Sequence, residues 1–501
     1  MDKTATNIIP RPPIVVIMGH IDHGKSTLLD YIRKTNIVDQ EEGGITQHVR
    51  AYEVEVKVPG NDGEEKRKIT FIDTPGHEAF CSIRERGSRV ADIAILVISA
   101  EDGIKPQTLE ALKCIKADNT PFIVAINKID KNRNGVEKIK QNLAENEVLV
   151  EGWGGTVPIV LVSGKTGENI PELLEIISLQ AELEELKADT KKSAEGFVIE
   201  SSLSPKQGIS STLVIKNGTL RTGDFLATKG AFAPVRNIEN FKGDSLKEAT
   251  VSSPIRITGW DKIPVVGEAF YAFKSKNDAA DFVASNREEV EKNSQDQEDE
   301  RKQLTLIVKA DTLGSLEAIE YELKKLGNDR LVPKIVSKGV GEINEGDVKN
   351  AMIKHSTVLG FNIHKNRAAD FLALREKVEV KDFKIIYELL DFVKEKIKQE
   401  TPVSQEESIT GVAKILRTFS RNKDKQVIGG KMEEGEIKMG NTIKIERRGN
   451  IVGDGKIKEM QSQKIKTSLV REGDEFGVMI ESKIDLVPGD LLKAVSLITR
   501  E

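Results

Sequence analysis

The sequence predicts an α/β plus β protein of several domains, and three observations carry this prediction. Between residues 14 and 182, apolar runs rich in Val and Ile alternate with helical patterns, which is typical of a parallel sheet covered on both faces. A glycine-rich loop of the kind that binds phosphate follows the first apolar run. After residue 194, and again after residue 403, short alternating strands separated by Gly and Asp turns indicate two β-barrels.

Length and composition limit the class of protein. A chain of 501 residues corresponds to about three or four domains. Its 38% apolar content and the lack of an apolar run of about 18 residues argue against a membrane span, and residues 1–13 contain no apolar core of an export signal. Cys81 and Cys114 are too few and too far apart for a disulfide framework or a thiolate zinc site, so we expect a cytoplasmic protein. The net charge of −5 neither requires nor excludes a nucleic-acid partner.

The phosphate loop follows the buried strand expected over residues 14–18 and precedes a helix that begins near Thr27. In this pattern, backbone N–H groups and the positive end of the helix converge on phosphate oxygens. We expect Lys25 to reach the β- and γ-phosphates and Ser26 to bind Mg²⁺; the alternative is a plain glycine turn. The predicted nucleotide-binding residues of this segment are Gly19, His20, Ile21, Asp22, His23, Gly24, Lys25, Ser26 and Thr27.

A second loop follows the apolar run at 69–72 and reads Asp73, Thr74, Pro75, Gly76. The Asp73 carboxylate can hold Mg²⁺ through water. Gly76 has no side chain, so its N–H can approach a γ-phosphate closely. Ligands of parallel sheets bind at the carboxyl ends of the strands, which is where this loop and the phosphate loop both lie.

Two further loops follow the apolar runs at 122–126 and 157–162. The Asp130 carboxylate can accept hydrogen bonds from two donors of guanine that adenine lacks, while the stems of Lys128 and Lys165 can pack against the base. These loops predict GTP rather than ATP. Their candidate residues are Asn127, Lys128 and Asp130 in the first, and Ser163, Gly164 and Lys165 in the second.

Four such loops in this order resemble those of the translational GTPases, and residues 43–48 and 73–80 are similar to the bacterial translation initiation factor 2 family. The resemblance implies that Thr46 belongs to a switch loop ordered by γ-phosphate and Mg²⁺. It also implies that His77 stands where Ras-like enzymes place a glutamine, and orients the attacking water. Hydrolysis of GTP to GDP is then expected to involve His77, Lys25, Thr46 and Gly76, with stimulation by a partner.

The rest of the chain divides by pattern. Residues 287–303 are almost wholly polar, with Val290 as the single apolar residue, and indicate a solvated helix or linker. Residues 311–315 lack a Gly-Lys-Ser/Thr ending, so we interpret them as a helix cap rather than a second phosphate site. Apolar residues at spacings of 3–4 from 383 to 400 predict one amphipathic helix. The predicted domains are a P-loop GTPase domain (11–186), a β-barrel (194–286), a charged linker (287–303), an α/β/α domain (304–378), a linker helix (379–402) and a C-terminal β-barrel (403–501).

The two predicted barrels contain an internal echo. Residues 217–224 and 434–441 match in type at most positions, with a turn, an apolar-basic step and a second turn. We therefore expect two β-domains of similar construction.

The resemblance implies a factor that promotes binding of initiator tRNA to the small ribosomal subunit and subunit joining, with GTP hydrolysis on the assembled ribosome. Its expected partners are both ribosomal subunits and formylmethionyl initiator tRNA, its ligands are GTP or GDP and Mg²⁺, and a monomer is expected. The chain begins close to the GTPase domain, so we expect a short form without an N-terminal extension.

In that family the last barrel binds the formylmethionyl end of the tRNA, and here the sequence departs from the family pattern. Lys464, Glu475 and Gly477 remain as candidates for contact with the tRNA. The alternative is a GTP-regulated ribosome-binding module that no longer selects formylated initiator tRNA; a third is an elongation-type factor. The departures are Gly430, Gln461, Gln463 and Phe476 in the barrel, and Arg50 beside the switch.

Overall fold

The computed structural model describes residues 8–34, 49–60, 63–74, 90–290, 301–328, 330–401, 405–422, 424–462 and 465–499. The chain forms two compact units, Met1–Glu400 and Thr401–Glu501. No helix of the described residues is long and apolar enough to cross a membrane.

The first domain, for which the sequence predicts GTP binding, is built on a six-stranded sheet with the order β3-β4-β2-β5-β6-β7. The expected strands are present and pair in parallel from β4 to β7. The edge strand β3 was not predicted, and it pairs antiparallel with β4. The bounds are β2 Ile14–Gly19, β3 Arg50–Gly60, β4 Gly63–Asp73, β5 Ile93–Ser99, β6 Phe122–Asn127 and β7 Ile159–Leu161.

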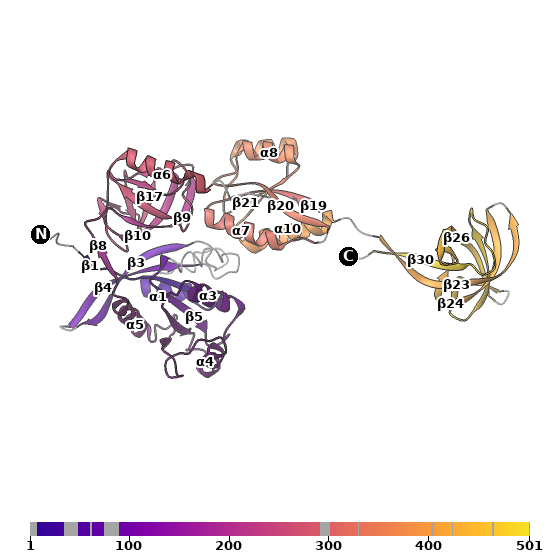
Figure 1. Cartoon of the computed structure of the whole chain (residues 1–501), viewed down its shortest axis with the longest axis horizontal. Coiled ribbons are helices and arrows are strands. Elements are labelled where there is room, and N and C mark those ends of the chain that lie inside the picture. Colours follow the sequence, from indigo (N-terminus) through magenta and orange to yellow (C-terminus); the bar gives the residue numbers. More distant parts are fainter. Residues whose placement is uncertain are drawn as a thin grey trace. The chain divides into compact units, whose positions relative to one another are not determined.

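Helices cover both faces of this sheet (Figure 1). Alternate residues of β2 point to opposite faces: Val15 and Ile17 pack with α1 (Lys25–Arg33) and α5 (Ile170–Leu183). Ile14 and Val16 belong to the core that includes α3 (Pro106–Ala117) and α4 (Val136–Glu145). Burial on both faces explains why β2 and β5 are continuous apolar runs.

The second domain is an eight-stranded sheet whose strand pairings form an open path, so the predicted barrel is a half-barrel. Helix α6 (Lys276–Val290) was not predicted. Its residues Ala279 and Val283 pack against phenylalanine side chains of the sheet. In sheet order the strands are β13 Phe232–Pro234, β12 Phe225–Ala227, β18 Ala269–Phe273, β9 Glu195–Ser204, β10 Gly208–Asn217, β17 Pro254–Thr258, β14 Ile238–Asn240 and β15 Ser245–Leu246. Two strand pairs lie outside this sheet: β1 Ile8–Pro10 with β8 Lys187–Asp189, and β11 Leu220–Arg221 with β16 Glu248–Ala249.

A buried ion network joins the first domain to the half-barrel. The Asp92 carboxylate accepts hydrogen bonds from both terminal guanidinium nitrogens of Arg11, at 2.6 and 2.5 Å, and from Lys216 Nζ of β10 at 2.6 Å. Burial alone would raise the pKa of Asp92, but the hydrogen bonds from Arg11 and the charge of Lys216 hold it below its usual value. Ser252 of the half-barrel adds a hydrogen bond from its hydroxyl to the Pro12 carbonyl at 2.6 Å.

The third domain is a parallel α/β layer with the strand order β20-β19-β21-β22. The predicted cap is confirmed, because the Thr312 hydroxyl accepts the Ser315 N–H at the start of α7. The elements are β19 Lys302–Ala310, α7 Leu313–Lys325, β20 Leu331–Val340, α8 Glu345–Lys354, β21 Thr357–Phe361, α9 Arg367–Glu376, β22 Val380–Phe383 and α10 Ile386–Glu400.

The helix predicted over 379–402 is not confirmed as a linker. Strand β22 occupies its first part, so Phe383 ends a strand that pairs with β21, and the helix begins at Ile386. The apolar face of α10, including Val393 and Ile397, is buried in the core of the α/β domain. An apolar stripe of this length would be exposed to water on a free-standing helix, which explains why α10 packs on its own domain.

The C-terminal unit is a β-structure in which six strands pair in a closed circuit, from β23 through β30, β25, β26, β29 and β24 back to β23. Its core contains Ile428, Ile443 and Ile480. The bounds are β23 Gln405–Asn422, β24 Lys425–Lys438, β25 Thr442–Arg447, β26 Asn450–Ser462, β27 Ile465–Lys466, β28 Leu469–Arg471, β29 Glu475–Glu481 and β30 Leu491–Thr499.

The predicted echo between the two β-domains has a physical basis. Asp224 Oδ2 accepts the Arg221 N–H at 3.0 Å, and Asn441 Oδ1 accepts the Lys438 N–H at 2.6 Å. In each case the residue before the acceptor is a glycine with φ near +90° (94° and 89°), a conformation that glycine adopts without steric cost. The two domains therefore use the same side-chain-closed turn.

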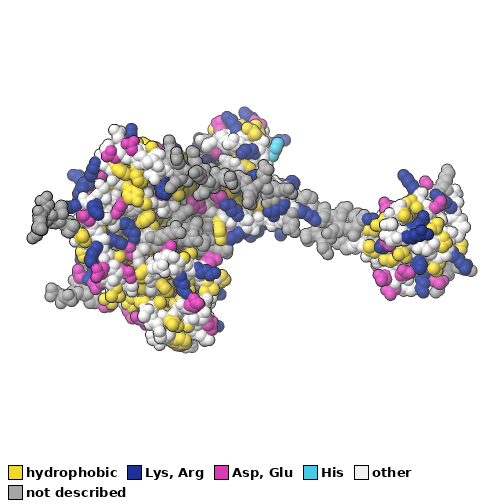
Figure 2. Space-filling view, in the orientation of Figure 1, with side chains coloured by type: hydrophobic (Ala, Val, Ile, Leu, Met, Phe, Trp, Pro, Cys, Tyr) yellow, Lys and Arg dark blue, Asp and Glu magenta, His cyan; other side chains and the backbone are white. Residues whose placement is uncertain are grey.

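The charged surface is mixed in sign. Figure 2 shows Lys and Arg side chains lying among Asp and Glu side chains over the visible face. Exposed pairs such as Lys394 with Asp391 contribute at most about 1 kcal/mol each. We therefore expect the buried Asp92 network to affect stability more than any of these exposed pairs.

Replacing Asp92 with Asn should destabilise the docking of the half-barrel by about 2–4 kcal/mol, because Arg11 and Lys216 would lose their buried counter-charge. Urea unfolding in a Trp153→Phe background lets the buried Trp260 of the half-barrel report the transition. Asp391→Asn is the matched surface control and should cost less than about 1 kcal/mol. Equal unfolding midpoints for the two variants would contradict the assigned role of Asp92.

Candidate nucleotide-binding site

The phosphate loop connects β2 to α1, and two of its glycines are required by close contacts. Gly19 has φ +145°, and a Cβ atom there would lie 2.4 Å from the Val97 carbonyl oxygen. Gly24 has φ +83°, and a Cβ atom there would lie 2.4 Å from Asn127 Nδ2. Any side chain at these positions would push the loop off the ends of β5 and β6.

The polar groups of the loop converge at the N-terminus of α1. Lys25 is buried and donates from Nζ to the carbonyl oxygens of Gly19 at 3.0 Å and His20 at 2.8 Å. Its ammonium group is therefore held within the loop. Ser26 is half-buried and Thr27 exposed in the first turn of the helix, where N–H groups and the helix dipole favour an anion.

The other loop residues are fixed by neighbouring elements. The Ile21 N–H donates to Gln107 Oε1 of α3 at 3.2 Å. Asp22 is exposed and has φ +62°, in the left-handed region that Asp tolerates better than most residues.

His23 is fully buried beneath the loop. Its Nδ1 lies 3.2 Å from the Val97 carbonyl oxygen, so the neutral ring donates this hydrogen bond. Burial lowers the pKa of His23 to about 4, against the opposing effect of that hydrogen bond. Burial also lowers the pKa of His20, whose ring centre lies 5.0 Å from that of His23. His23 thus shapes the loop as a neutral side chain.

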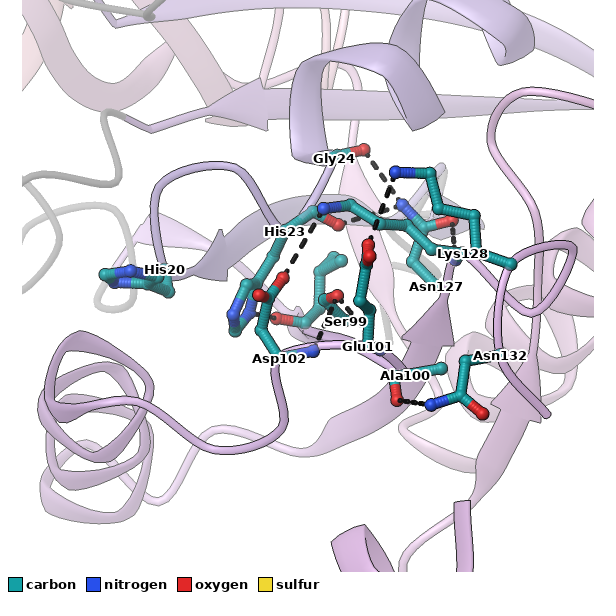
Figure 3. Close-up of polar contacts among 12 residues, drawn as sticks. His20, His23, Gly24, Ser99, Ala100, Glu101, Asp102, Asn127, Lys128 and Asn132 are labelled. Carbon is teal, nitrogen blue, oxygen red and sulfur yellow. Dashed lines mark hydrogen bonds and ion pairs between the residues drawn. The ribbon is translucent and has the colours of Figure 1, made fainter. Parts of the chain in front are cut away.

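One amide side chain joins three loops. Asn127 Nδ2 donates to the His23 carbonyl at 2.9 Å and to the Gly24 carbonyl at 3.2 Å (Figure 3). Asn127 Oδ1 accepts the N–H of Lys128 at 2.8 Å and the N–H of Gly164 at 2.9 Å. The phosphate loop and both predicted base loops are therefore brought together at the end of β6.

The two base loops also contact each other directly. The Ser163 hydroxyl donates to Asp130 Oδ1 at 2.7 Å, which orients the exposed Asp130 carboxylate. Gly164 packs against α1, since a Cβ atom there would lie 3.0 Å from the Leu28 backbone. Lys128 has φ +64°, and Lys165 is exposed. The predicted residues from 127 to 165 thus lie at one edge of the sheet.

A neighbouring contact was not predicted from the sequence. The Ser99 hydroxyl at the end of β5 accepts the N–H groups of Glu101 and Asp102, both at 3.2 Å (Figure 3). Lys128 Nζ lies 3.5 Å from Asp102 Oδ2. The hydrogen bond to Ser99 and the charge of Lys128 lower the pKa of Asp102. The position of Ser99 at the end of a buried apolar run could have suggested a role, but Ser99 belongs to no recognisable motif.

Oxygen donors suitable for Mg²⁺ lie at neighbouring strand ends. Asp73 ends β4, is 7% exposed, and stands opposite Ile17 of β2. Thr74 donates its hydroxyl to the Ile17 carbonyl at 2.8 Å, which holds this loop beside the phosphate loop. Among the described residues no group of three or more His, Cys, Asp or Glu could hold a metal ion. Ser26 and Asp73 fit Mg²⁺, which commonly takes few protein ligands together with phosphate oxygens and water.

Several predicted residues lie outside the described part of the chain. They are Thr46, Pro75, Gly76, His77, Gln463 and Lys464.

The C-terminal departures are accommodated as a pair. Gly430 of β24 stands directly opposite Phe476 of β29, and Phe476 is 5% exposed in the core. A Cβ atom at position 430 would lie 2.8 Å from the Lys414 carbonyl oxygen and 3.2 Å from the Phe476 ring. The ring of Phe476 thus packs beside a glycine that leaves room for it. Gln461 and Glu475 are exposed and Gly477 is half-buried nearby on β26 and β29.

Three protein-family models match successive parts of the chain. Residues 11–182 match the elongation factor Tu GTP binding domain, and residues 193–273 match elongation factor G domain 2. Residues 279–394 match translation-initiation factor 2. These matches agree with a P-loop GTPase domain, a half-barrel and a parallel α/β domain in this order.

Whole-chain relatives carry the same description. Translation initiation factor IF-2 of Halothermothrix orenii is 39% identical over 498 residues, which cover 96% of this chain and 71% of that protein. The factor of Aquifex aeolicus is 39% identical over 500 residues, and that of Nitratiruptor sp. is 41% identical over 501. This chain spans 61% and 58% of the lengths of those two relatives.

A solved structure is also similar. GDP-bound aIF5B from Aeropyrum pernix is 27% identical, with a TM-score of 0.50, and the match covers 97% of this chain and 92% of that one. The order of the domains is therefore shared with a protein solved with a guanine nucleotide.

The buried neutral His23 predicts a loss of stability in acid. Between pH 6.5 and about 4 the unfolded chain binds a proton at this residue that the folded chain does not, so stability falls as pH decreases through this window. At pH 5 the contribution is about 2 kcal/mol.

His23→Asn keeps a donor for the Val97 carbonyl but cannot titrate, so its urea midpoint should fall less between pH 7.5 and 5. Fluorescence of Trp153 in a Trp260→Phe background follows the GTP-binding domain. The exposed His364 gives the control His364→Asn, which should follow the parent protein. Parallel pH profiles for parent and His23→Asn would rule out this contribution.

Proposed function

The chain belongs to the translation initiation factor IF-2 family, and we propose that it is a GTP-dependent factor that promotes binding of initiator tRNA to the small ribosomal subunit and subunit joining. It hydrolyses GTP on the assembled ribosome. The observation that carries the nucleotide part of the proposal is the Asn127 amide, which joins the phosphate loop to both base loops. The family relationship supports the ribosomal part.

Guanine is recognised by the two base loops. The Asp130 carboxylate accepts from the ring N1–H and the exocyclic amine of guanine, and Ser163 holds it in position. A backbone N–H of the loop from Ser163 to Lys165 meets the guanine carbonyl oxygen, while the stems of Lys128 and Lys165 lie on the two sides of the base. Adenine offers no matching pair of donors, so GTP is preferred over ATP.

The phosphates are bound by the loop from Gly19 to Ser26 and by the first turn of α1. Lys25 donates to the β- and γ-phosphates. Ser26, Asp73 and Thr46 hold Mg²⁺, which when bound neutralises phosphate charge. Gly76, which follows Thr74 and Pro75 in the sequence, is the proposed contact of this loop with the γ-phosphate.

Hydrolysis depends on His77 and Gly76. Gly76 donates its N–H to the γ-phosphate, and His77 orients a water molecule in line with the γ-phosphorus. As the water oxygen bonds to phosphorus, the bond from phosphorus to the bridging oxygen breaks and leaves GDP and phosphate. The ribosome stimulates this step by bringing His77 into position. Loss of γ-phosphate then releases the switch loop that contains Thr46.

The proposed partners are both ribosomal subunits and formylmethionyl initiator tRNA. The protein is proposed to act as a monomer in the cytoplasm. The acceptor end of the tRNA contacts the C-terminal β-domain, with Lys464, Glu475 and Gly477 as candidates.

A second candidate function rests on the pair Gly430 and Phe476. The phenyl ring packs in the core beside Gly430, and both positions are among the departures from the family pattern. Under this candidate the protein binds the ribosome in a GTP-regulated manner without selecting the formyl group.

Asp130→Asn should shift the nucleotide preference from guanine toward xanthine. The amide offers a donor to the 2-oxo group of xanthine and removes an acceptor for the donors of guanine. We expect GTP affinity to fall by about 100-fold or more, with a gain for XTP, measured by competition with a fluorescent nucleotide. Asp391→Asn is the control. An unchanged preference for guanine would refute the contact.

His77→Ala should lower ribosome-stimulated GTP hydrolysis by about 10²–10⁴-fold while leaving GTP affinity nearly unchanged. The effect on turnover alone is expected because the side chain orients water and does not hold the nucleotide. Single-turnover phosphate release on assembled ribosomes measures the rate, and the exposed His364→Ala serves as control. Retained turnover in His77→Ala would defeat the assignment of this residue.

A further inference from the structure

A cavity in the first unit, separate from the nucleotide-binding loops, has the composition of an anion site. It has a volume of about 260 Å³ and lies between the GTP-binding domain and the half-barrel. Its lining includes Arg33, Arg50 and Tyr52 from the first domain and Phe241 and Arg256 from the second. Arg33 ends α1, eight residues after Lys25, so the cavity begins roughly 12 Å along the helix axis from the phosphate loop.

Two guanidinium groups in this lining have no carboxylate within ion-pair distance among the residues that the structure describes. The guanidinium carbon of Arg33 lies 4.0 Å from the ring centre of Tyr52. Arg256 Nη2 donates to Gln207 Oε1 at 2.8 Å and to Ser210 Oγ at 3.2 Å, both of which are uncharged. These contacts orient the two arginines without cancelling their charge.

Acidic residues only partly offset this charge. Glu239 faces Arg256 from the neighbouring strand β14, and Glu200 of β9 also lines the cavity. Burial, and then the charge of Asp311, raise the pKa of Glu200 to about 8, although the Val49 N–H and Arg50 oppose the shift. The lining therefore places Arg33 and Arg256 beside Glu200 and Glu239, and burial disfavours the charged form of Glu200.

The walls between the charged groups are apolar. Val49 and Ile255 are 5% and 1% exposed, and both line the cavity. Low-polarity walls strengthen the attraction between a guanidinium group and an anion. The planar fork of arginine matches the oxygens of a phosphate, and Phe241, which is 37% exposed, offers a ring on which a base can stack.

We propose that this cavity binds a phosphate group, carried either by a free phosphate compound or by single-stranded RNA, through Arg33 and Arg256. The volume admits a phosphate or one nucleotide unit and excludes a duplex. The proposal does not depend on GTP hydrolysis or on the tRNA partner. Arg50 and Tyr52 belong to β3, which follows the predicted switch residue Thr46 by only a few positions, so the ligand contacts a strand adjoining the switch.

Calorimetric titration of the full chain tests the proposal, with the nucleotide site saturated by GDP and Mg²⁺ after GDP affinity has been measured separately. The probes are inorganic phosphate and a 5′-phosphorylated single-stranded RNA octamer. We expect Arg33→Gln with Arg256→Gln to weaken binding of the probe by at least about 10-fold, because each loses a charge-assisted hydrogen bond. GDP affinity should stay within about twofold, since these arginines lie outside the nucleotide loops.

Matched variants separate this effect from net charge and folding. Arg375→Gln removes a charge from the exposed face of α9 and should bind the probes like the parent. Arg33→Lys with Arg256→Lys keeps the charge and should lose less binding than the Gln pair. If the Gln pair unfolds, as judged by Trp260 fluorescence, each single Gln variant is titrated in its place.

The outcomes divide cleanly. Binding of phosphate that the Gln variants weaken supports a site for free phosphate compounds, and binding of the octamer alone supports RNA. Absence of binding for both probes up to about 10 mM, or equal binding by parent and Gln variants, would overturn the proposal. Failure of GDP binding would instead speak against the proposed function and leave the phosphate titration interpretable.

Discussion

The nucleotide site depends on the side chain of Asn127. Four hydrogen bonds from this amide tie the phosphate loop, the loop that holds Asp130 and the loop that holds Gly164 to the end of β6. Each bond alone contributes about 1 kcal/mol, but together they fix the distance between the phosphate-binding and base-binding groups. The site therefore binds a ligand whose triphosphate and guanine have the matching separation.

A second set of contacts, the buried ion pairs of Asp92, joins the sheet that carries the nucleotide site to the half-barrel. Asp92 lies at the amino end of β5, opposite the edge that carries the nucleotide loops, and binds Arg11 and Lys216 there. The sheet thus has a nucleotide edge and a docking edge. The cavity lined by Arg33 and Arg256 is formed by residues of both domains. Strand β3 contributes Arg50 to this cavity and follows the predicted switch residue Thr46 in the sequence. Under the proposed function, β3 therefore connects the switch loop to the contact between the domains.

Much of the site could be predicted because local patterns determine it. Continuous Val and Ile runs identify buried parallel strands, and the loops after them must meet at one edge. The partners of Asn127, Ser163 and Asp92 could not be predicted, since a polar side chain chooses its partner through tertiary contacts far apart in sequence. The helix at 386–400 shows the same limit: its apolar stripe was evident, but not that its own domain covers it. Phe383 was misassigned because a short edge strand and a helix start have similar apolar spacing.

The most direct test of the proposed function measures binding of initiator tRNA to the small ribosomal subunit in the presence of this protein. Formylated and unformylated methionyl initiator tRNA are compared, each with GTP in a non-hydrolysable form and with GDP. The proposal predicts that the protein increases binding of the formylated tRNA, and more with the GTP analogue than with GDP. Equal binding of the two tRNAs, or no dependence on the nucleotide, would contradict it.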